Sequence, residues 1–249
     1  MDFKGKSVVY IGGFGGIGQK CIEELLKREI GFLFIFELAT NDEYVKKLKE
    51  SFSNCKIEHI SVDMSKVATI ENAYKCVMEK IKHIDMVVNG SGILNERLID
   101  LSVAVNLTGV IHSNFIALSY MSKANGGHGG LIVNIASVAG LEPMAFTAVY
   151  SATKSGVISF TKSMANPSYF QNTGVSFIAI CPGGTITKLL ADLQSKSTFP
   201  EFFEEVKKSM GKQALQSADA FAEEFIKILE IAYNGTVWTV EGGTVKNVD

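Results

Sequence analysis

The chain has 249 residues, enough for one α/β domain with a substantial core, and its 47% apolar and 20% charged residues are typical of a soluble globular protein. Its formal net charge of −2 offers no attraction to nucleic acid or to an anionic membrane surface, so neither is expected as a partner. The first six residues lack the apolar core of a signal peptide, and we therefore expect a cytoplasmic protein.

Short apolar runs alternate with longer segments of helical periodicity along the chain. The predicted strands are residues 7–11, 33–37, 57–62, 86–89, 130–135, 175–180 and 235–240. The predicted helices are residues 16–28, 42–52, 70–82, 98–122, 149–164, 202–210 and 218–232. Most of the strands are apolar throughout, as in a sheet covered on both faces. We therefore predict one domain over residues 1–249 with a Rossmann-type α/β fold, in which helices cover both faces of a doubly wound, parallel, seven-stranded sheet.

A glycine-rich loop follows the first predicted strand and opens the first predicted helix. Its candidate cofactor-binding residues are Gly12, Phe14, Gly15, Gly16, Ile17 and Gly18. Residues without a Cβ allow a sharp turn and bring backbone N–H groups close to a pyrophosphate at a helix N-terminus, where the helix dipole favours negative charge. The strand–loop–helix context indicates a dinucleotide site, and the alternative is a flexible turn without a ligand.

Two acidic residues follow at the ends of the next two strands. Glu37 stands about 20 residues after the last loop glycine, where a carboxylate can accept hydrogen bonds from the adenosine ribose and repels a 2′-phosphate. No Lys or Arg stands at position 15, 38 or 39, which favours NAD over NADP as the cofactor. Asp63 and the adjacent Met64 end the third strand on the same sheet edge and are candidates for the adenine side. The alternative is that both acids merely face water.

Three polar residues form the candidate reaction centre. Tyr150 and Lys154 lie four residues apart on one face of a predicted helix, a spacing that alone is close to chance. Ser137 follows the preceding strand, and a strand end and the first turn of the next helix can meet over the crevice. Ser137 would hold a substrate oxygen and Tyr150 would exchange its proton. The Lys154 ammonium would lower the pKa of the phenol from about 10 toward neutrality.

These motifs resemble the short-chain dehydrogenase/reductase superfamily over essentially the whole chain. Besides the glycine loop, the resemblance rests on Asn89-Gly90-Ser91-Gly92 and on Pro182-Gly183-Gly184-Thr185-Ile186-Thr187. It implies that the first segment closes the fourth strand beneath the cofactor and that the second surrounds the nicotinamide carboxamide. The cofactor-binding residues implied in this way are Asn89, Gly90, Ser91, Pro182, Gly183, Thr185 and Thr187, together with Tyr150 and Lys154.

The resemblance also implies a fourth catalytic residue, Asn106, whose backbone carbonyl would hold a water in a proton relay to Lys154. Two positions depart from the family pattern. Ile11 stands where the family often has Thr, and Gly90 stands where it often has a second Asn. Both departures affect hydrogen bonding around the loops rather than the reacting groups.

A narrower likeness links the chain to the insect alcohol dehydrogenase branch, which includes fat-body development-specific proteins. It rests on the stretches 8–18, 88–94, 125–140 and 234–238, and residues 120–161 are also similar to 15-hydroxyprostaglandin dehydrogenases. The branch is NAD-dependent and usually dimeric. The resemblance therefore implies a homodimer paired through the helices of Asn106 and Tyr150, with a homotetramer as the alternative.

The sequence thus predicts an NAD-dependent oxidoreductase that interconverts a small apolar primary or secondary alcohol and its aldehyde or ketone. No metal is expected, because Tyr150 would perform the acid–base step and no His accompanies the four cysteines at ligand spacing. The alternatives are an NAD-binding fat-body storage or regulatory protein with little catalysis, and an epimerase or dehydratase acting on a nucleotide sugar. An apolar pocket is predicted from Leu141, Met144, Phe146, Phe199, Phe202 and Phe203, unless these side chains serve only helix packing.

Overall fold

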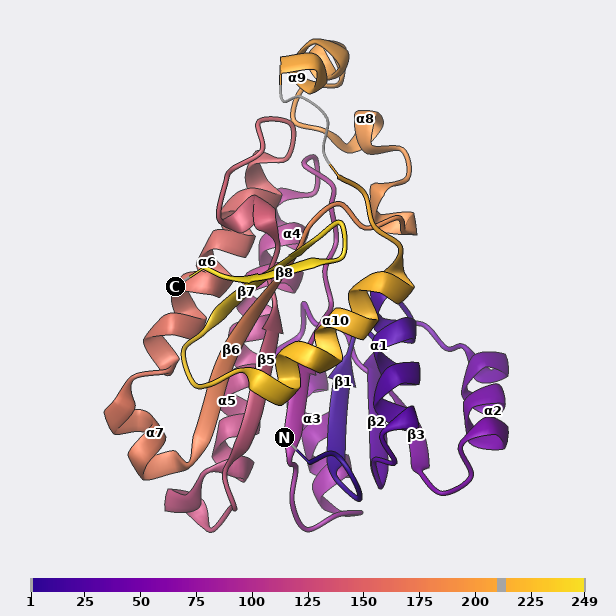
Figure 1. Cartoon of the computed structure of the whole chain (residues 1–249), viewed down its shortest axis with the longest axis vertical. Coiled ribbons are helices and arrows are strands. Elements are labelled where there is room, and N and C mark those ends of the chain that lie inside the picture. Colours follow the sequence, from indigo (N-terminus) through magenta and orange to yellow (C-terminus); the bar gives the residue numbers. More distant parts are fainter. Residues whose placement is uncertain (1, 210–213, 249) are drawn as a thin grey trace.

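One sheet forms the centre of the computed structural model, which describes residues 2–209 and 214–248. The strand order is β3-β2-β1-β4-β5-β6-β7-β8 (Figure 1). The first seven strands run parallel, and β8 pairs antiparallel with β7. The strands are β1 Ser7–Ile11, β2 Phe32–Glu37, β3 Lys56–Ser61, β4 Met86–Asn89, β5 Gly130–Ile135, β6 Val175–Pro182, β7 Val237–Glu241 and β8 Thr244–Asn247.

Helices lie between successive parallel strands along the chain. They are α1 Gly16–Lys27, α2 Asp42–Ser51, α3 Val67–Met78, α4 Ile99–Val103, α5 Gly109–Met121, α6 Ala148–Met164, α7 Pro167–Thr173, α8 Leu193–Lys196, α9 Phe203–Ser209 and α10 Ala218–Ile231. A π-helical turn, Ala104–Thr108, joins α4 to α5 without a break.

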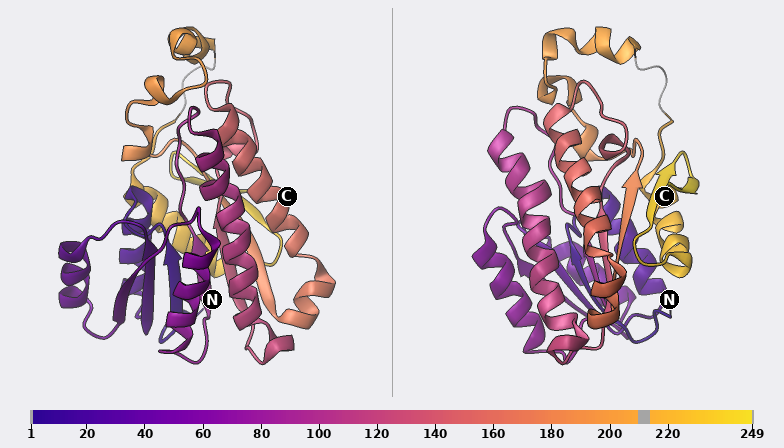
Figure 2. Two further views of the ribbon diagram at one scale, coloured as in Figure 1. Left: turned by 180° about the vertical axis from the view of Figure 1, so that it is seen from behind. Right: turned by 90° about the vertical axis from the view of Figure 1, so that its left-hand side faces the viewer.

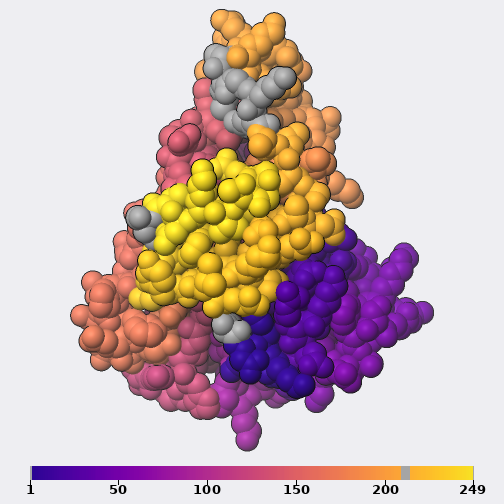
Figure 3. Space-filling model, viewed as in Figure 1, coloured from indigo at the N-terminus to yellow at the C-terminus, as the bar shows by residue number. Residues whose placement is uncertain are grey.

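Two helical layers cover the sheet, and each encloses its own hydrophobic core. On one face α1 packs against α10, and their buried Leu25 and Phe225 share a core cluster with Tyr10 of β1. Figure 3 shows this face, with the C-terminal segments in yellow beside α1 in indigo. On the other face lie α3, α5 and α6, seen in front of the sheet in the left view of Figure 2. Tyr74 of α3 and Phe177 of β6 belong to that second core.

The strand order reverses at β1, whose two neighbours are β2 and β4. At such a switch point the connections leave to opposite faces of the sheet, and a crevice opens at the carboxyl ends of the strands. The glycine loop after β1 and the loops after β4, β5 and β6 therefore meet at one edge.

The predicted doubly wound α/β fold is confirmed, but the predicted strand number is wrong, because the sheet has eight strands. Strand β8 contains one apolar residue and lies at an exposed edge, so it has no hydrophobic run to detect. Its signal is the Gly242-Gly243 pair, whose φ values of 56° and 76° form the tight turn between β7 and β8. The short helices α7 and α8 were also not predicted, and residue 210 of the predicted helix 202–210 lies outside the described residues.

The predicted helix 98–122 corresponds to the run from α4 through the π-helical turn to α5. By length and composition alone, Ile99–Met121 could cross a membrane, and 39% of its most apolar window is buried within the fold. Its inner side carries the fully buried polar residues Asn106, Ser113 and Asn114. A core helix of a globular α/β domain has the same composition.

Candidate active site and cofactor cleft

The glycine loop is shaped for a close ligand at the N-terminus of α1. Gly12 has φ +82°, and a Cβ there would lie 2.6 Å from the backbone nitrogen of Ser91. A Cβ at Gly18 would overlap the Gly12 carbonyl oxygen, and one at Gly16 would lie 2.7 Å from Thr187. The N-cap of α1 is Gly15, which has no capping side chain, and the first turn carries no acid. Within the part of the chain that the structure describes, no side chain caps the N–H groups of this helix end, which fits a pyrophosphate.

Glu37 lies where the sequence predicts it, at the carboxyl end of β2 beside the glycine loop. Its carboxylate accepts hydrogen bonds from the backbone N–H of Phe14 at 3.4 Å and of Leu38 at 3.1 Å. The Phe14 ring packs against His59 and Tyr44, with ring centroids 5.1 and 6.0 Å away. The acid is thus held at the loop where an adenosine ribose would lie next to a pyrophosphate bound at α1.

Asp63 is engaged within its own loop after β3. Its carboxylate accepts hydrogen bonds from the hydroxyl and backbone N–H of Ser65, at 2.6 and 3.0 Å, and pairs with Lys66 at 3.0 Å. The side-chain hydrogen bond from Ser65 is the main reason that the pKa of this carboxyl lies below its usual value. Met64 is buried in the second core. Contacts of either residue with adenine remain predictions.

The loop after β4 contributes Gly90 to the lining of the cavity beside the glycine loop. The Asn89 amide donates to Asn134 Oδ1 at 2.9 Å, while its own Oδ1 is buried without a partner. The backbone N–H of Gly90 donates to the Ile11 carbonyl at 2.9 Å. A Cβ at Gly90 would lie 3.2 Å from the ring of Tyr10. It would also lie 3.0 Å from the Ile11 carbonyl oxygen, so a side chain at this position would be crowded by both β1 residues.

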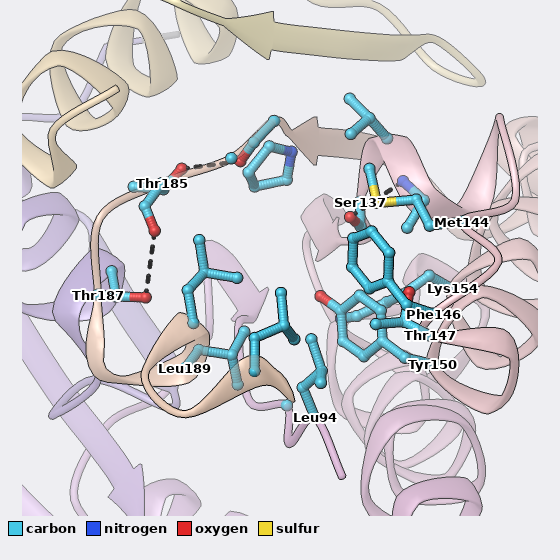
Figure 4. Close-up of a pocket in the computed structure, with 18 of the residues that line it drawn as sticks. Leu94, Ser137, Met144, Phe146, Thr147, Tyr150, Lys154, Thr185, Thr187 and Leu189 are labelled. Atoms are coloured by element: carbon cyan, nitrogen blue, oxygen red, sulfur yellow. Dashed lines mark hydrogen bonds between the residues drawn. The ribbon is translucent and has the colours of Figure 1, made fainter. Parts of the chain in front are cut away.

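The structure brings Ser137, Tyr150 and Lys154 together at the head of the cleft (Figure 4). Ser137 follows β5 and begins a short 3-10 turn, whose Ala139 N–H donates to its hydroxyl at 3.2 Å. Tyr150 lies in the first turn of α6, and Lys154 follows one turn later. The Lys154 ammonium donates to the Ile135 carbonyl at 2.8 Å and lies 5.6 Å from the centroid of the Tyr150 ring.

The expected lowering of the phenol pKa is not found in the chain alone. Burial raises the pKa of Tyr150 to about 12, and the hydrogen bond with Ser137 lowers it only in part. Burial also lowers the pKa of Lys154 from 10.5 to about 8. Burial is the main cause of both pKa changes, and the ammonium is bonded to a backbone carbonyl rather than to the phenol.

Asn106 occupies the π-helical turn and is completely buried. Its side-chain oxygen accepts from the Ile93 N–H at 2.8 Å, and its amide donates to the Ile93 carbonyl at 2.8 Å and to Thr153 at 3.4 Å. The side chain therefore binds the loop after β4 to α6, a contact that the sequence did not indicate. The role of its backbone carbonyl in a water relay stays a prediction.

The loop after β6 is held by a residue that sequence reasoning missed. Pro182 is the last residue of β6, and the next N–H, that of Gly183, donates to the Val240 carbonyl at 2.8 Å. The Thr185 hydroxyl donates to the Gly183 carbonyl at 3.0 Å, and the Thr187 hydroxyl to the Thr185 carbonyl at 3.4 Å (Figure 4). The buried Gln216 amide donates to Thr185 at 3.2 Å. No local pattern marks such a partner, which lies 31 residues away.

A cavity of about 1300 Å³ adjoins these groups. Its predicted lining residues Met144, Phe146 and Phe203 are confirmed, and the rings of Phe146 and Phe203 lie 5.5 Å apart. The cavity is also lined by Ile17 at the cofactor side and by Leu94, Leu189, Leu190, Leu193 and Leu215.

Three predicted pocket residues, Leu141, Phe199 and Phe202, are exposed and lie outside the lining of this cavity. The rings of Phe199 and Phe202 lie near each other, with centroids 6.1 Å apart. Within residues 2–209 and 214–248, no group of three or more His, Cys, Asp or Glu side chains is arranged to hold a metal ion.

Comparisons with known proteins agree with this architecture. Residues 6–198 match the family model for short chain dehydrogenases. Over the whole chain it is 34% identical to "Alcohol dehydrogenase 1" of Ceratitis capitata and 35% identical to "Fat body protein 2" of Drosophila melanogaster, covering 96% of each. It is also 34% identical to the "Development-specific 25 kDa protein" of Sarcophaga peregrina, of which it covers 97%.

Among solved structures, levodione reductase superposes with a TM-score of 0.81 at 22% identity, covering 97% of this chain and 98% of that one. A 3-ketoacyl-(acyl-carrier-protein) reductase from Brucella melitensis, complexed with NADH, superposes with a TM-score of 0.77 at 23% identity over the same shares. The fold, the arrangement of the site and these relatives together establish that the chain belongs to the short-chain dehydrogenase family of oxidoreductases.

Proposed function

We propose that the chain is an NAD-dependent oxidoreductase that interconverts an apolar primary or secondary alcohol and its aldehyde or ketone. The single observation that carries the proposal is the convergence of Ser137, Tyr150 and Lys154 at one end of a largely apolar cavity that also reaches the glycine loop. An apolar wall beside a few convergent polar groups suits a hydrophobic carbinol.

The proposed choice of NAD rests on Glu37. The glycine loop and the N-terminus of α1 would hold the pyrophosphate, and Glu37 would accept hydrogen bonds from the adenosine ribose. Its carboxylate, held by two backbone N–H groups, would repel a 2′-phosphate at that place. When bound, the oxidised nucleotide would accept a hydride from the carbinol carbon, and its positive charge would favour the phenolate form of Tyr150.

The residues of the chain would perform the proton transfer. Tyr150 would take the hydroxyl proton of the alcohol, while the Ser137 hydroxyl would hold the substrate oxygen. The Lys154 ammonium, 5.6 Å from the phenol ring, would favour a phenolate once the cofactor is bound, because opposite charges attract. The leucines and phenylalanines around the cavity would exclude water from the reacting atoms.

The test is Tyr150→Phe, assayed by NADH absorbance with a panel of alcohols and ketones. Removing the phenol oxygen should lower turnover by at least about 10²–10⁴-fold, the range that positioned acid–base groups contribute. Affinity for NADH, measured by fluorescence titration, should stay nearly intact. Tyr169→Phe, an exposed tyrosine on α7, is the matched control.

Equal turnover in Tyr150→Phe and in the unaltered protein would refute the proposed mechanism. NADH binding without turnover of any panel member would favour the second candidate, a nucleotide-binding protein without catalysis. This second candidate is included because two relatives are named as a fat body protein and a development-specific protein rather than as enzymes.

We also propose that the functional unit is a homodimer formed through α4, α5 and α6. Apolar side chains on this side are strongly exposed, among them Ile99 at 55% and Phe115 at 52%, and the Phe115 ring packs 5.7 Å from that of Phe160 on α6. A second copy would cover them. Sedimentation without detergent should give a species of two chains, and a single-chain species or a need for detergent would contradict the proposal.

A further inference from the structure

A buried carboxylate outside the reacting groups holds the start of the catalytic helix. Glu96, in the loop after β4, is 7% exposed. Its two oxygens accept from the backbone N–H groups of Val149 at 2.6 Å and of Tyr150 at 3.0 Å. The helix's own N-cap residue, Thr147, makes no capping hydrogen bond. The N-terminus of α6 is therefore capped by a side chain from a distant loop, and its dipole favours the negative charge there.

The same carboxylate reaches the segment that covers the cavity, residues 188–203. The Thr198 hydroxyl donates to Glu96 Oε2 at 3.3 Å and accepts from the Ala148 N–H at 3.4 Å. The Glu96 N–H donates to the Lys196 carbonyl at 2.9 Å, and the Thr198 N–H donates to the Phe146 carbonyl at 3.0 Å. Glu96 thus joins three segments at one point: its own loop, the first turn of α6 and the covering segment.

These contacts have a mechanical consequence for the site. The covering segment contributes Leu189, Leu193 and Phe203 to the wall of the cavity that holds the reacting groups. Among the residues that the structure describes, no Lys or Arg forms an ion pair with Glu96. The buried charge is met by N–H and O–H donors alone, so each donor lost leaves an unbalanced carboxylate.

We propose that Glu96 is a positioning residue that fastens the covering segment 188–203 to the helix start carrying Tyr150. Contacts between substrate and the covering segment are then coupled to the alignment of the phenol. The inference rests on the proposed function for its kinetic consequences, but the coupling between the two segments is a property of the fold. Glu96 is not among the residues that line the cavity, and it acts through Tyr150.

Two variants test separately the contacts of Glu96 with α6 and with the covering segment. Glu96→Gln keeps the side-chain volume but turns one acceptor oxygen into an NH₂ group, which would face a backbone N–H of α6. Thr198→Val removes only the hydroxyl that links the covering segment. Asn166→Ala is the matched control, because it removes the cap of α7, where Asn166 accepts from the Ser168 N–H, away from the cavity.

The first readout is hydrogen exchange measured by mass spectrometry on the complete protein. Glu96→Gln should speed exchange both in the first turn of α6 and in residues 188–203, whereas Thr198→Val should act mainly on 188–203. Asn166→Ala should change neither region. Faster exchange confined to α6 in Glu96→Gln would refute the coupling, whether or not the protein turns over any alcohol.

The second readout is the split between KM and kcat, using the panel alcohol with the highest turnover. Thr198→Val should raise KM more than it lowers kcat. Glu96→Gln should raise KM and also lower kcat about tenfold, because small misplacements of a reacting group are costly. The double variant should lose less than the sum of the two single losses, since the hydroxyl and the carboxylate share one contact. Additive losses, or a Glu96→Gln protein that is less stable but kinetically normal, would overturn the proposal.

Discussion

Replacing Lys154 with Met should stabilise the nucleotide-free protein near neutral pH while removing its activity. Burial lowers the pKa of this ammonium from 10.5 to about 8, a difference that corresponds to about 3–4 kcal/mol at about 1.4 kcal/mol per pH unit. Against this gain stands the loss of the 2.8 Å hydrogen bond to the Ile135 carbonyl, and bonds from charged groups contribute about 1.5–3 kcal/mol. The net expectation is a gain of about 1 kcal/mol, or about 2–4 °C in Tm for a chain of this length.

The free energy of unfolding of the unaltered protein and that of Lys154→Met should change differently with pH. Between pH 8 and 10.5 the unfolded chain still holds the lysine proton that the folded chain has released. The unfolded state therefore binds more protons, and the stability of the unaltered protein rises with pH over this range. Lys154→Met lacks this rise, so its advantage at pH 7 should shrink and then reverse toward pH 10.

Thermal unfolding followed by circular dichroism at pH 7, 8, 9 and 10 would measure this crossover. Lys49→Met is the matched control, because it removes an exposed lysine on α2, away from the cavity. The control should show no crossover. A Tm difference between Lys154→Met and the unaltered protein that is the same at pH 7 and pH 10 would refute the assignment of a costly buried ammonium.

Three further substitutions probe the loops and the core. Gly18→Ala places a methyl group against the Gly12 carbonyl and should lower the free energy of unfolding by about 1–3 kcal/mol and weaken NADH binding; normal NADH affinity would contradict the tight loop geometry. Gln216→Leu removes the buried donor to Thr185, so the affinity for NADH, measured by titration, should fall. The free energy of unfolding, measured by thermal unfolding, should fall by about 1–3 kcal/mol. An unaltered NADH affinity would show that the loop does not depend on Gln216. Asn134→Ala breaks the buried amide network between β4, β5, α5 and α6. The free energy of unfolding, measured with denaturant, should fall by about 1–3 kcal/mol, and a smaller fall would contradict a stabilising role of that network.

Local patterns in the sequence were sufficient for the main architecture. The apolar runs predicted seven strands, all found within two residues of their observed starts and ends. The glycine string predicted a tight loop, and the structure shows the close backbone contacts that exclude side chains there. These features are recoverable because periodicity, chain reversal and steric demand act between residues close together in the chain.

The spacing of Ser137, Tyr150 and Lys154 also predicted their meeting, since a strand end and the next helix start adjoin in any parallel sheet. The Tyr150–Lys154 pair alone would not have sufficed, because such a spacing arises by chance. The supporting partners were out of reach of this reasoning. Glu96 reaches the start of α6 across 53 and 54 residues, and Gln216 reaches Thr185 across 31.

The sequence by itself thus determined the kind of fold, the place of the glycine loop and which side chains are candidates for the reaction. Only the tertiary structure decided their ionisation, since the pKa values of Tyr150 and Lys154 depend on how completely the surrounding elements exclude water. It alone also decided that Asn106 and Glu96 bind the loop after β4 to α6. Burial and long-range hydrogen bonding are properties of packed elements, and no local run of residues encodes them.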